Sequence, residues 1–247
     1  MKEIDPPQLA EILRLNPRAV ALTGAGISVE SGIPDFRSPG GLWERFDPLE
    51  YAHIAAFRRN PAKVWLLIKE MDATIVRARP NPAHLALAEL EAKGHLMGII
   101  TQNVDNLHQA VGSRHVVEYH GNAGRFVCLA CNRGFPRESL DFEKVPLYCP
   151  CGGPIKPDVV FFGEAIPVAA QEEALRLARG CDLMLLIGTS GEVAPANYLP
   201  QIAKDRGAVI AECNLAATRL THTLTDYFLP GPAGEVLPLV LKDLAGG

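Results

Sequence analysis

Four of the six cysteines lie in one short window of the chain, at Cys128, Cys131, Cys149 and Cys151. They form a C-x2-C pair followed by a C-x-C pair, and four thiolates complete the tetrahedral shell that Zn²⁺ prefers without leaving a position for water. A segment as small as 123–157 rarely folds on an apolar core alone. We therefore predict one structural zinc ion per chain; the alternative is a loop with four reduced, metal-free thiols.

Glycines cluster where the first apolar run of the chain ends. Ala19–Leu22 leads into residues 23–28, Thr-Gly-Ala-Gly-Ile-Ser. A chain that leaves a sheet here must turn tightly and can let a phosphate reach its backbone amides. Val29 stands where a dinucleotide fingerprint has its third glycine, so the motif is partial. The run favours a dinucleotide site, and a glycine turn without a ligand is the alternative.

A long loop at residues 31–41 follows these glycines and combines a carboxylate, an aromatic ring and a guanidinium at Asp35, Phe36 and Arg37. Loops of this length in such a position are usually functional. The sequence Gln-Asn-Val-Asp at residues 102–105 also follows an apolar run. Ligands of open α/β sheets bind at the carboxyl ends of the strands, so we expect both segments to contact a ligand.

His120 is the histidine with the strongest functional signal. It ends the apolar run Val116–Tyr119 and lies close to the cysteine window, so it could be a zinc ligand or a general base. Because four cysteines already complete a zinc shell and imidazole titrates near neutral pH, a general base is the better interpretation. His108 is a weaker candidate. The remaining histidines, Cys181 and Cys213 are interpreted as structural.

The elements that must position these groups follow from hydrophobic patterning. Apolar, β-rich runs bounded by turn residues predict strands, and helix-period stretches lie between several of them. Strands that alternate with helices predict an α/β fold with a doubly wound, mostly parallel, Rossmann-like sheet. The predicted strands are 19–22, 98–101, 116–119, 159–162, 183–187 and 209–211, and the predicted helices include 82–92, 167–179 and 196–204.

Two insertions interrupt the alternation of strands and helices. One holds helical patterns and both tryptophans, and the other holds the four clustered cysteines. We expect them to form a smaller lobe, made of a helical part at 42–95 and a zinc module at 123–157. The large Rossmann-like lobe would then comprise 1–41, 96–122 and 158–247.

Composition and charge limit the possible partners. The 247 residues include 24 Lys and Arg against 28 Asp and Glu, which gives a net charge of -4 and a pI near 6.0. This balance argues against a nucleic-acid partner. The longest apolar run, Leu183–Ile187, is far shorter than the roughly 18 residues of a membrane span. Acidic residues and prolines at the N-terminus argue against a signal peptide. We expect a cytoplasmic protein without a membrane partner, and its oligomeric state stays open.

Taken together, the motifs resemble the sirtuin family of NAD-dependent protein-lysine deacylases, and we expect a member of bacterial type. The resemblance starts with GAGIS at 24–28 and SGIPDFR at 31–37. It implies that residues 1–247 form one catalytic unit with NAD as cosubstrate and a structural zinc ion. Further matching segments are 102–105, 120–121, 157–164, 188–190, 212–214 and 234–238.

The resemblance also implies a reaction. The oxygen of an acyl-lysine attacks the anomeric carbon of the nicotinamide ribose, nicotinamide leaves, and the acyl group passes to ADP-ribose. His120 would be the general base, Asn103 would orient the ribose and a water, and Asp105 would bind the carboxamide of nicotinamide. The residues implied to bind NAD are Gly24, Ala25, Gly26, Ser28, Ile33, Asp35, Phe36, Arg37, Trp43, Gln102, Asn103, Val104, Asp105, Gly188, Thr189, Ser190, Asn214, Leu215 and Ala233.

The implied partner is an acylated lysine in a protein or peptide, bound as an extended strand between the lobes. Relatives that prefer succinyl or malonyl lysine carry Tyr-x-x-Arg after an Asn-Pro turn, and alignment on Asn60-Pro61 places Ile68 and Met71 at those positions. An apolar pair cannot offset the desolvation of a carboxylate, so we expect neutral acyl groups to be preferred. The residues implied to contact substrate are Ile68, Met71, Val160, Phe161, Phe162, Gly163, Glu192 and Val193.

Other functions fit parts of the pattern. A mono-ADP-ribosyltransferase or NAD hydrolase would use the same nicotinamide pocket. A non-catalytic NAD-binding or zinc-binding interaction module is disfavoured by the combination of Asn103, Asp105 and His120. A zinc hydrolase would act without NAD, and a dehydrogenase is disfavoured by the missing third glycine and the missing ribose-binding acid.

Overall fold

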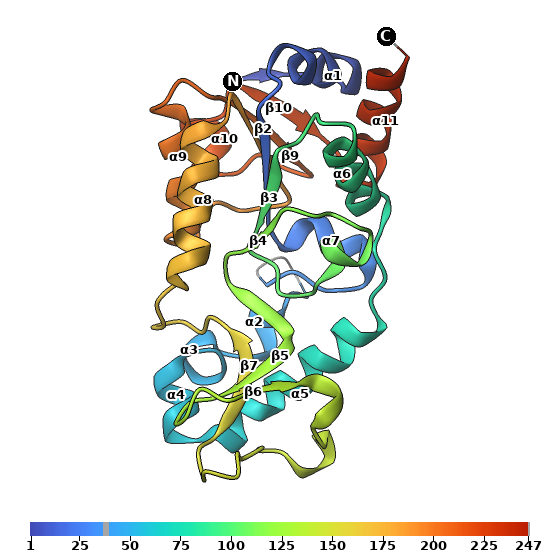
Figure 1. The fold of residues 1–247 in the computed structure, drawn as a ribbon. Coiled ribbons are helices and arrows are strands. Elements are labelled where there is room, and N and C mark those ends of the chain that lie inside the picture. Colours follow the sequence, from blue (N-terminus) through green and yellow to red (C-terminus); the bar gives the residue numbers. More distant parts are fainter. Residues whose placement is uncertain (37–39, 247) are drawn as a thin grey trace.

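The computed structural model describes residues 1–36 and 40–246, which fold into a large lobe and a small lobe (Figure 1). The large lobe contains a seven-stranded parallel sheet in the order β1-β10-β9-β8-β2-β3-β4. The strands are β1 (Lys2–Glu3), β2 (Ala19–Thr23), β3 (Gly98–Thr101), β4 (Val116–Glu118), β8 (Leu183–Ile187), β9 (Val209–Asn214) and β10 (Tyr227–Pro230).

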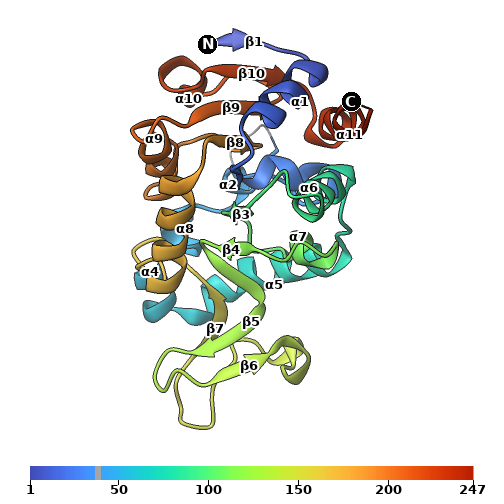
Figure 2. The same cartoon turned by 45° about the horizontal axis from the view of Figure 1, so that its top comes forward.

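Both faces of this sheet are covered by helices, as Figure 2 shows. Every residue of β2 and β8 is buried, which is the pattern of strands packed on both faces. One apolar core joins the sheet to α1 (Pro6–Leu15), α6 (Pro82–Ala92) and α11 (Ala233–Ala245). The second core joins it to α8 (Val168–Gly180), α9 (Leu199–Lys204) and α10 (Arg219–Thr223). The doubly wound α/β class is therefore confirmed.

The small lobe combines a three-stranded antiparallel sheet with helices. The sheet order is β6-β5-β7, from β5 (Gly121–Cys128), β6 (Gly134–Pro136) and β7 (Ile155–Val159). The helices are α2 (Leu42–Arg45), α3 (Pro48–Tyr51), α4 (Ile54–Arg59) and α5 (Pro61–Arg77). In the core of this lobe, Trp65 of α5 stacks on Phe126 of β5, with ring centroids 6.1 Å apart.

Local sequence signals set the helix starts. The Asn81 side chain accepts hydrogen bonds from the amides of Ala83 and His84, and Pro82 occupies the first helical position of α6. Asn60 and Pro61 begin α5 in the same way. This combination satisfies amides that have no partner inside the helix. The remaining short elements are α7 (Leu107–Ala110) and the 3-10 turns η1 (Ala25–Ser31), η2 (Arg137–Ser139), η3 (Phe142–Lys144) and η4 (Ala196–Tyr198).

One predicted strand is wrong. Residues 159–162 do not form a strand of the parallel sheet: β7 ends at Val159 and pairs antiparallel with β5 in the small lobe. The chain crosses between the lobes here, and the amide of Val160 bonds to the carbonyl of His120 (2.9 Å) while Phe162 forms an isolated bridge with His53. An apolar run alone cannot distinguish a buried strand from such a buried crossing.

The predicted boundary of the small lobe also needs correction. Residues 82–92, assigned to that lobe within 42–95, form α6, whose Leu87 and Leu90 belong to the core shared with α1 and α11.

The predicted helix at 196–204 starts with the turn η4 before α9 begins. The strands β1 and β10 were not predicted: β1 has only two residues, and β10 ends in a proline, which argues against a strand inside a sheet. Among the described residues, no helix is long and apolar enough to cross a membrane.

Candidate active site and zinc centre

A pocket of about 720 Å³ lies at the carboxyl ends of the central strands and extends to residues of the small lobe. Chain order along the sheet reverses between β2 and β8, and ligands of open α/β sheets bind at such a switch point. Residues of the NAD set that line the pocket are Gly24, Ala25, Gly26, Asp35, Phe36, Trp43, Gln102, Asn103, Val104, Gly188, Thr189, Ser190, Asn214, Leu215 and Ala233. His120 lines it as well.

The other four residues of the NAD set are not among the described residues that line the pocket. Ser28, Ile33 and Asp105 are buried behind the lining residues. Arg37 lies outside the described residues. Of the substrate set, Ile68, Met71, Val160, Phe161, Phe162, Gly163 and Val193 line the pocket, and Glu192 does not.

Three glycines interlock where β2 and β8 end. A Cβ on Gly26 would lie 2.7 Å from the Cα of Gly188, and a Cβ on Gly24 would lie 2.8 Å from the Gly188 carbonyl oxygen. Gly188 itself has φ +58, and its Cβ would meet the Ile27 amide nitrogen at 2.4 Å. The amides of Gly24 and Gly26 are bonded to carbonyls of β8 and Gly188. These glycines therefore serve the close approach of two loops, a reason distinct from phosphate access.

A buried polar network holds the Gln-Asn-Val-Asp segment. Ser28 donates its hydroxyl to Asp105 (2.7 Å), and the Asn103 amide donates to the Ser28 oxygen and to the Gly24 carbonyl (both 3.0 Å). The second oxygen of Asp105 accepts from the Leu107 amide (3.0 Å). Each polar group thus has a fixed role, and the network pins the glycine turn to the end of β3.

His120 is oriented by a backbone carbonyl. Its Nδ1 lies 3.1 Å from the Gln102 carbonyl oxygen, which can only accept, so Nδ1 carries the proton and Nε2 keeps its lone pair. Burial lowers the pKa of His120 below 6.5, and the bond to Gln102 partly opposes this shift. The imidazole is therefore neutral at pH 7 and suited to accept a proton at Nε2.

The residue after His120 must be glycine. Gly121 has φ +80, and a Cβ there would lie 2.1 Å from the Asp158 carbonyl oxygen. This close approach lets β5 leave the histidine and pair with β7. The His-Gly pair therefore joins the two lobes at the candidate base.

Aromatic rings cover one side of the pocket. Phe36 stacks on Trp43 with ring centroids 5.0 Å apart, and Trp43 lies 6.3 Å from Phe162. The amide of Trp43 also bonds to the Phe36 carbonyl (3.0 Å). These rings provide an apolar wall that can exclude water from a reacting centre.

A buried lysine supports the wall on which the substrate was expected to bind. Lys156 is 4% exposed, and its Nζ lies 3.0 Å from Glu164, 2.6 Å from the Val159 carbonyl and 4.8 Å from the Phe161 ring centroid. Glu164 also accepts from the Phe161 amide (2.9 Å). Sequence reasoning missed both residues' contacts because a lone Lys and a distant Glu carry no pairing signal in the sequence.

The loop at the end of β9 is held by a buried carboxylate that sequence reasoning also missed. Glu212 is 1% exposed and accepts from the hydroxyls of Thr218 (2.7 Å), Thr221 (2.6 Å) and Thr225 (2.9 Å). Asn214 donates to it as well (3.2 Å). The bonds fix residues 214–218, which line the pocket.

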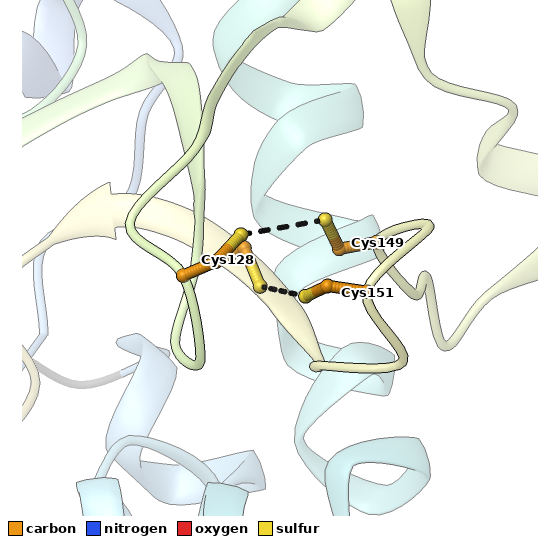
Figure 3. Close-up of side chains that lie close together, drawn as sticks. Cys128, Cys149 and Cys151 are labelled. Carbon is orange, nitrogen blue, oxygen red and sulfur yellow. Dashed lines mark hydrogen bonds between the residues drawn. The ribbon is translucent and has the colours of Figure 1, made fainter.

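Four cysteine sulfurs converge in the small lobe, where Figure 3 shows Cys128, Cys149 and Cys151 pointing toward one another from two turns. All four Sγ atoms lie within 4.8 Å of each other, with Cys128–Cys151 at 3.5 Å and Cys131–Cys149 at 3.7 Å. Zn–S bonds of about 2.3 Å in a tetrahedron require S–S separations of about 3.8 Å. The C-x-C spacing therefore fits a structural zinc site, with no ligand from His120.

The comparisons with known proteins agree with this geometry. The profile of the Sir2 family matches residues 24–195. The chain is 48% identical over 236 residues to a protein of Pyrobaculum aerophilum named NAD-dependent protein deacylase 2. The aligned region covers 96% of this chain and 94% of that protein. It is 44% identical to a protein of Pyrococcus furiosus named NAD-dependent protein deacylase, over 96% of this chain and 97% of that protein.

Solved structures extend the same likeness to three dimensions. A crystal structure of a Sir2 homologue in complex with NAD has a TM-score of 0.90 and 42% identity, covering 97% of this chain and 93% of the other. The chain belongs to the Sir2 family, the sirtuins. The expectation of a bacterial type is not borne out, because both relatives named above are archaeal.

Proposed function

We propose that the protein is an NAD-dependent protein-lysine deacylase, and specifically a deacetylase. The observation that carries this proposal is the orientation of His120: its protonated Nδ1 faces Gln102 while Nε2 stays an acceptor in a pocket that Asn103 also lines. The names of the relatives support the activity. The Asp105 and Ser28 network beside Asn103 supports the binding of a nicotinamide amide.

Bound NAD supplies a ribose carbon that accepts the acyl oxygen and a nicotinamide leaving group. His120 takes the proton of a ribose hydroxyl at Nε2 and so raises the nucleophilicity of that oxygen. Asn103, itself fixed by Ser28 and Gly24, orients the ribose and a water. Asp105 and Ser28 determine the polarity around the carboxamide, and Phe36 excludes water from the reacting carbon.

The interlocked glycines support the fit of a dinucleotide. The loops after β2 and β8 approach so closely that a single added methyl group would collide with the opposite loop. Backbone atoms therefore form this part of the pocket wall. Gly188, Thr189, Ser190, Asn214, Leu215 and Ala233 are assigned to the adenosine half. The zinc ion is assigned a structural role, since its four sulfur ligands leave no position for substrate.

An acylated lysine peptide is assigned to the edge formed by Val160–Gly163. The amides of Val160, Phe161 and Phe162 are bonded within the protein. Among the described residues, no hydrogen bond engages the Gly163 amide or the Val160 carbonyl, so these are the backbone groups that we assign to the peptide. Recognition through backbone supports a broad range of protein substrates. The location that we propose for the protein is the cytoplasm.

A mono-ADP-ribosyltransferase would use the same pocket but a different acceptor. The two activities are separated by incubating the protein with NAD and an acetyl-lysine peptide and measuring nicotinamide, free lysine peptide and O-acyl-ADP-ribose together. A deacylase yields the three products in equal amounts. Nicotinamide release without lysine deacylation would contradict the proposal. His120→Ala should abolish turnover while ADP-ribose still binds.

A further inference from the structure

The charged side chains that line the pocket are all acidic among the described residues. They are Glu30, Asp35, Asp72 and Glu164, and no described lining residue is Lys or Arg. Asp72 is neutralised by Arg137 (2.5 Å) and Glu164 by Lys156 (3.0 Å). Glu30 differs from these two because its bond is to a backbone amide, that of Gly234 (2.8 Å), which carries no full charge.

Glu30 lies at the end of the pocket that we assign to adenosine. A Cβ on Gly234 would lie 2.7 Å from either carboxylate oxygen of Glu30, so this carboxylate sits directly on the first turn of α11. Cys213, which lines the same pocket beside Asn214, has a pKa raised to about 12, mainly by burial and further by Glu212 and Glu30.

Glu212 is a second carboxylate side chain at this end. Its described hydrogen bonds come from three threonine hydroxyls and an amide, and such neutral donors stabilise a carboxylate without cancelling its charge. Glu30 bonds to Gly234, next to Ala233, and Glu212 bonds to Asn214, so both carboxylates lie beside residues assigned to the adenosine half. A third anionic group would therefore be repelled here.

We propose that Glu30 selects dinucleotides with a free 2′-hydroxyl on the adenosine ribose and excludes those with a 2′-phosphate. The proposal rests on the proposed function, since it assumes that the pocket holds NAD. Sites that accept the 2′-phosphate provide an arginine beside it. Here a carboxylate lines the pocket instead, so the phosphate would lose solvation and gain repulsion.

The test compares ADP-ribose with 2′-phospho-ADP-ribose by isothermal titration calorimetry, which needs no turnover. Wild-type protein should prefer ADP-ribose. Glu30→Gln should reduce that preference by about tenfold, because glutamine carries no charge. Glutamine can still accept the hydrogen bond from the Gly234 amide. Glu235→Gln is the matched control: it removes the same charge from the first turn of α11 at an exposed position that does not line the pocket. It should keep the wild-type ratio.

Three outcomes would overturn the proposal. An unchanged ratio in Glu30→Gln, or an equal change in Glu235→Gln, would remove the special role of Glu30 while NAD-dependent deacylation stays intact. Failure of wild-type protein to bind ADP-ribose would refute the proposed function as well. If Glu30→Gln does not fold, the wild-type preference should shrink as salt rises from about 0.05 M to about 0.5 M, and a salt-independent preference would contradict the electrostatic origin.

Discussion

At the scale of single residues, one backbone carbonyl determines what His120 can do. The Gln102 carbonyl requires a proton on Nδ1, and this fixes the tautomer that leaves Nε2 basic. The strand end that carries the histidine was predictable from the apolar run before it. The tautomer was not, because it depends on a carbonyl brought close by the pairing of β3 with β4.

The pH profile of turnover tests this assignment. Burial lowers the pKa of His120 below 6.5, so the neutral base persists into mildly acidic solution and is lost only as pH falls through the lowered value. We expect the acid limb of kcat/KM for NAD to fall below pH 6.5. An acid limb at or above pH 6.5 would show that burial does not control this group.

Acyl selectivity provides a second prediction at this scale. Ile68 and Met71 line the pocket from α5 and offer no charge to an acidic acyl group. Acetyl-lysine peptide should be cleaved at least about tenfold faster than succinyl-lysine peptide, since a carboxylate would be desolvated without a partner. The double change Ile68→Tyr and Met71→Arg should reverse the direction of this preference. Faster desuccinylation by the wild-type protein would contradict the alignment.

At the scale of elements, the zinc module depends on turns that carry its ligands. Cys128 and Cys149 belong to the same core as Trp65 and Phe126, so metal and core stabilise one another. The spacing of the cysteines in the sequence predicted the four sulfurs that converge here. It did not predict the bidentate pair of Arg137 with Asp72 (both bonds 2.5 Å) that ties this module to α5, because such long-range pairs leave no local pattern.

Removal of zinc should unfold the small lobe. A chelator at pH 7 withdraws a contribution of about 10 kcal/mol or more, which exposes Trp65, a side chain that is 1% exposed in the fold. We expect a red shift of tryptophan emission, measured in a Trp43→Phe background so that the signal comes from Trp65. Unchanged emission after full loss of zinc would mean that the apolar core suffices.

At the scale of the whole molecule, α6 and α7 place two buried histidines behind the active site. His84 and His108 are fully or almost fully buried, with ring centroids 4.9 Å apart. Burial lowers the pKa of His84 to about 4 and that of His108 to about 3. The sequence assigned His84 a structural role but could not show this contact, because it joins helices separated by β3.

Acid should therefore destabilise the large lobe. Both folded pKa values lie below the unfolded value of 6.5, so stability is full above pH 6.5 and falls as the unfolded chain takes up protons, until about pH 3 to 4. Each histidine adds a slope of about 1.4 kcal/mol per pH unit. His108→Gln should flatten the dependence of melting temperature on pH, whereas His222→Gln, at an exposed position, should not. An equal dependence of melting temperature on pH in the wild-type protein and both variants would show that the buried histidines do not cause the loss of stability in acid.

The parallel sheet was predictable because buried strands are continuous apolar runs. The assignment of α6 to the large lobe was not, because its apolar face reveals burial but not the partner, which is α11 at the far end of the chain. Pocket residues such as Glu30 escaped notice for the same reason. Their importance comes from neighbours that only the tertiary fold supplies.

The interlocked glycines restrict how this scaffold can be re-engineered. Any side chain at residue 24, 26 or 188 collides with the opposite loop, so a mutagenesis library aimed at a new dinucleotide should keep these three codons fixed. Diversity belongs at residue 30 and along 215–217, which line the cavity without bearing on that contact. Variants with a side chain at any of these three positions could not bring the two loops into contact, and a library that varied them would consist largely of such variants.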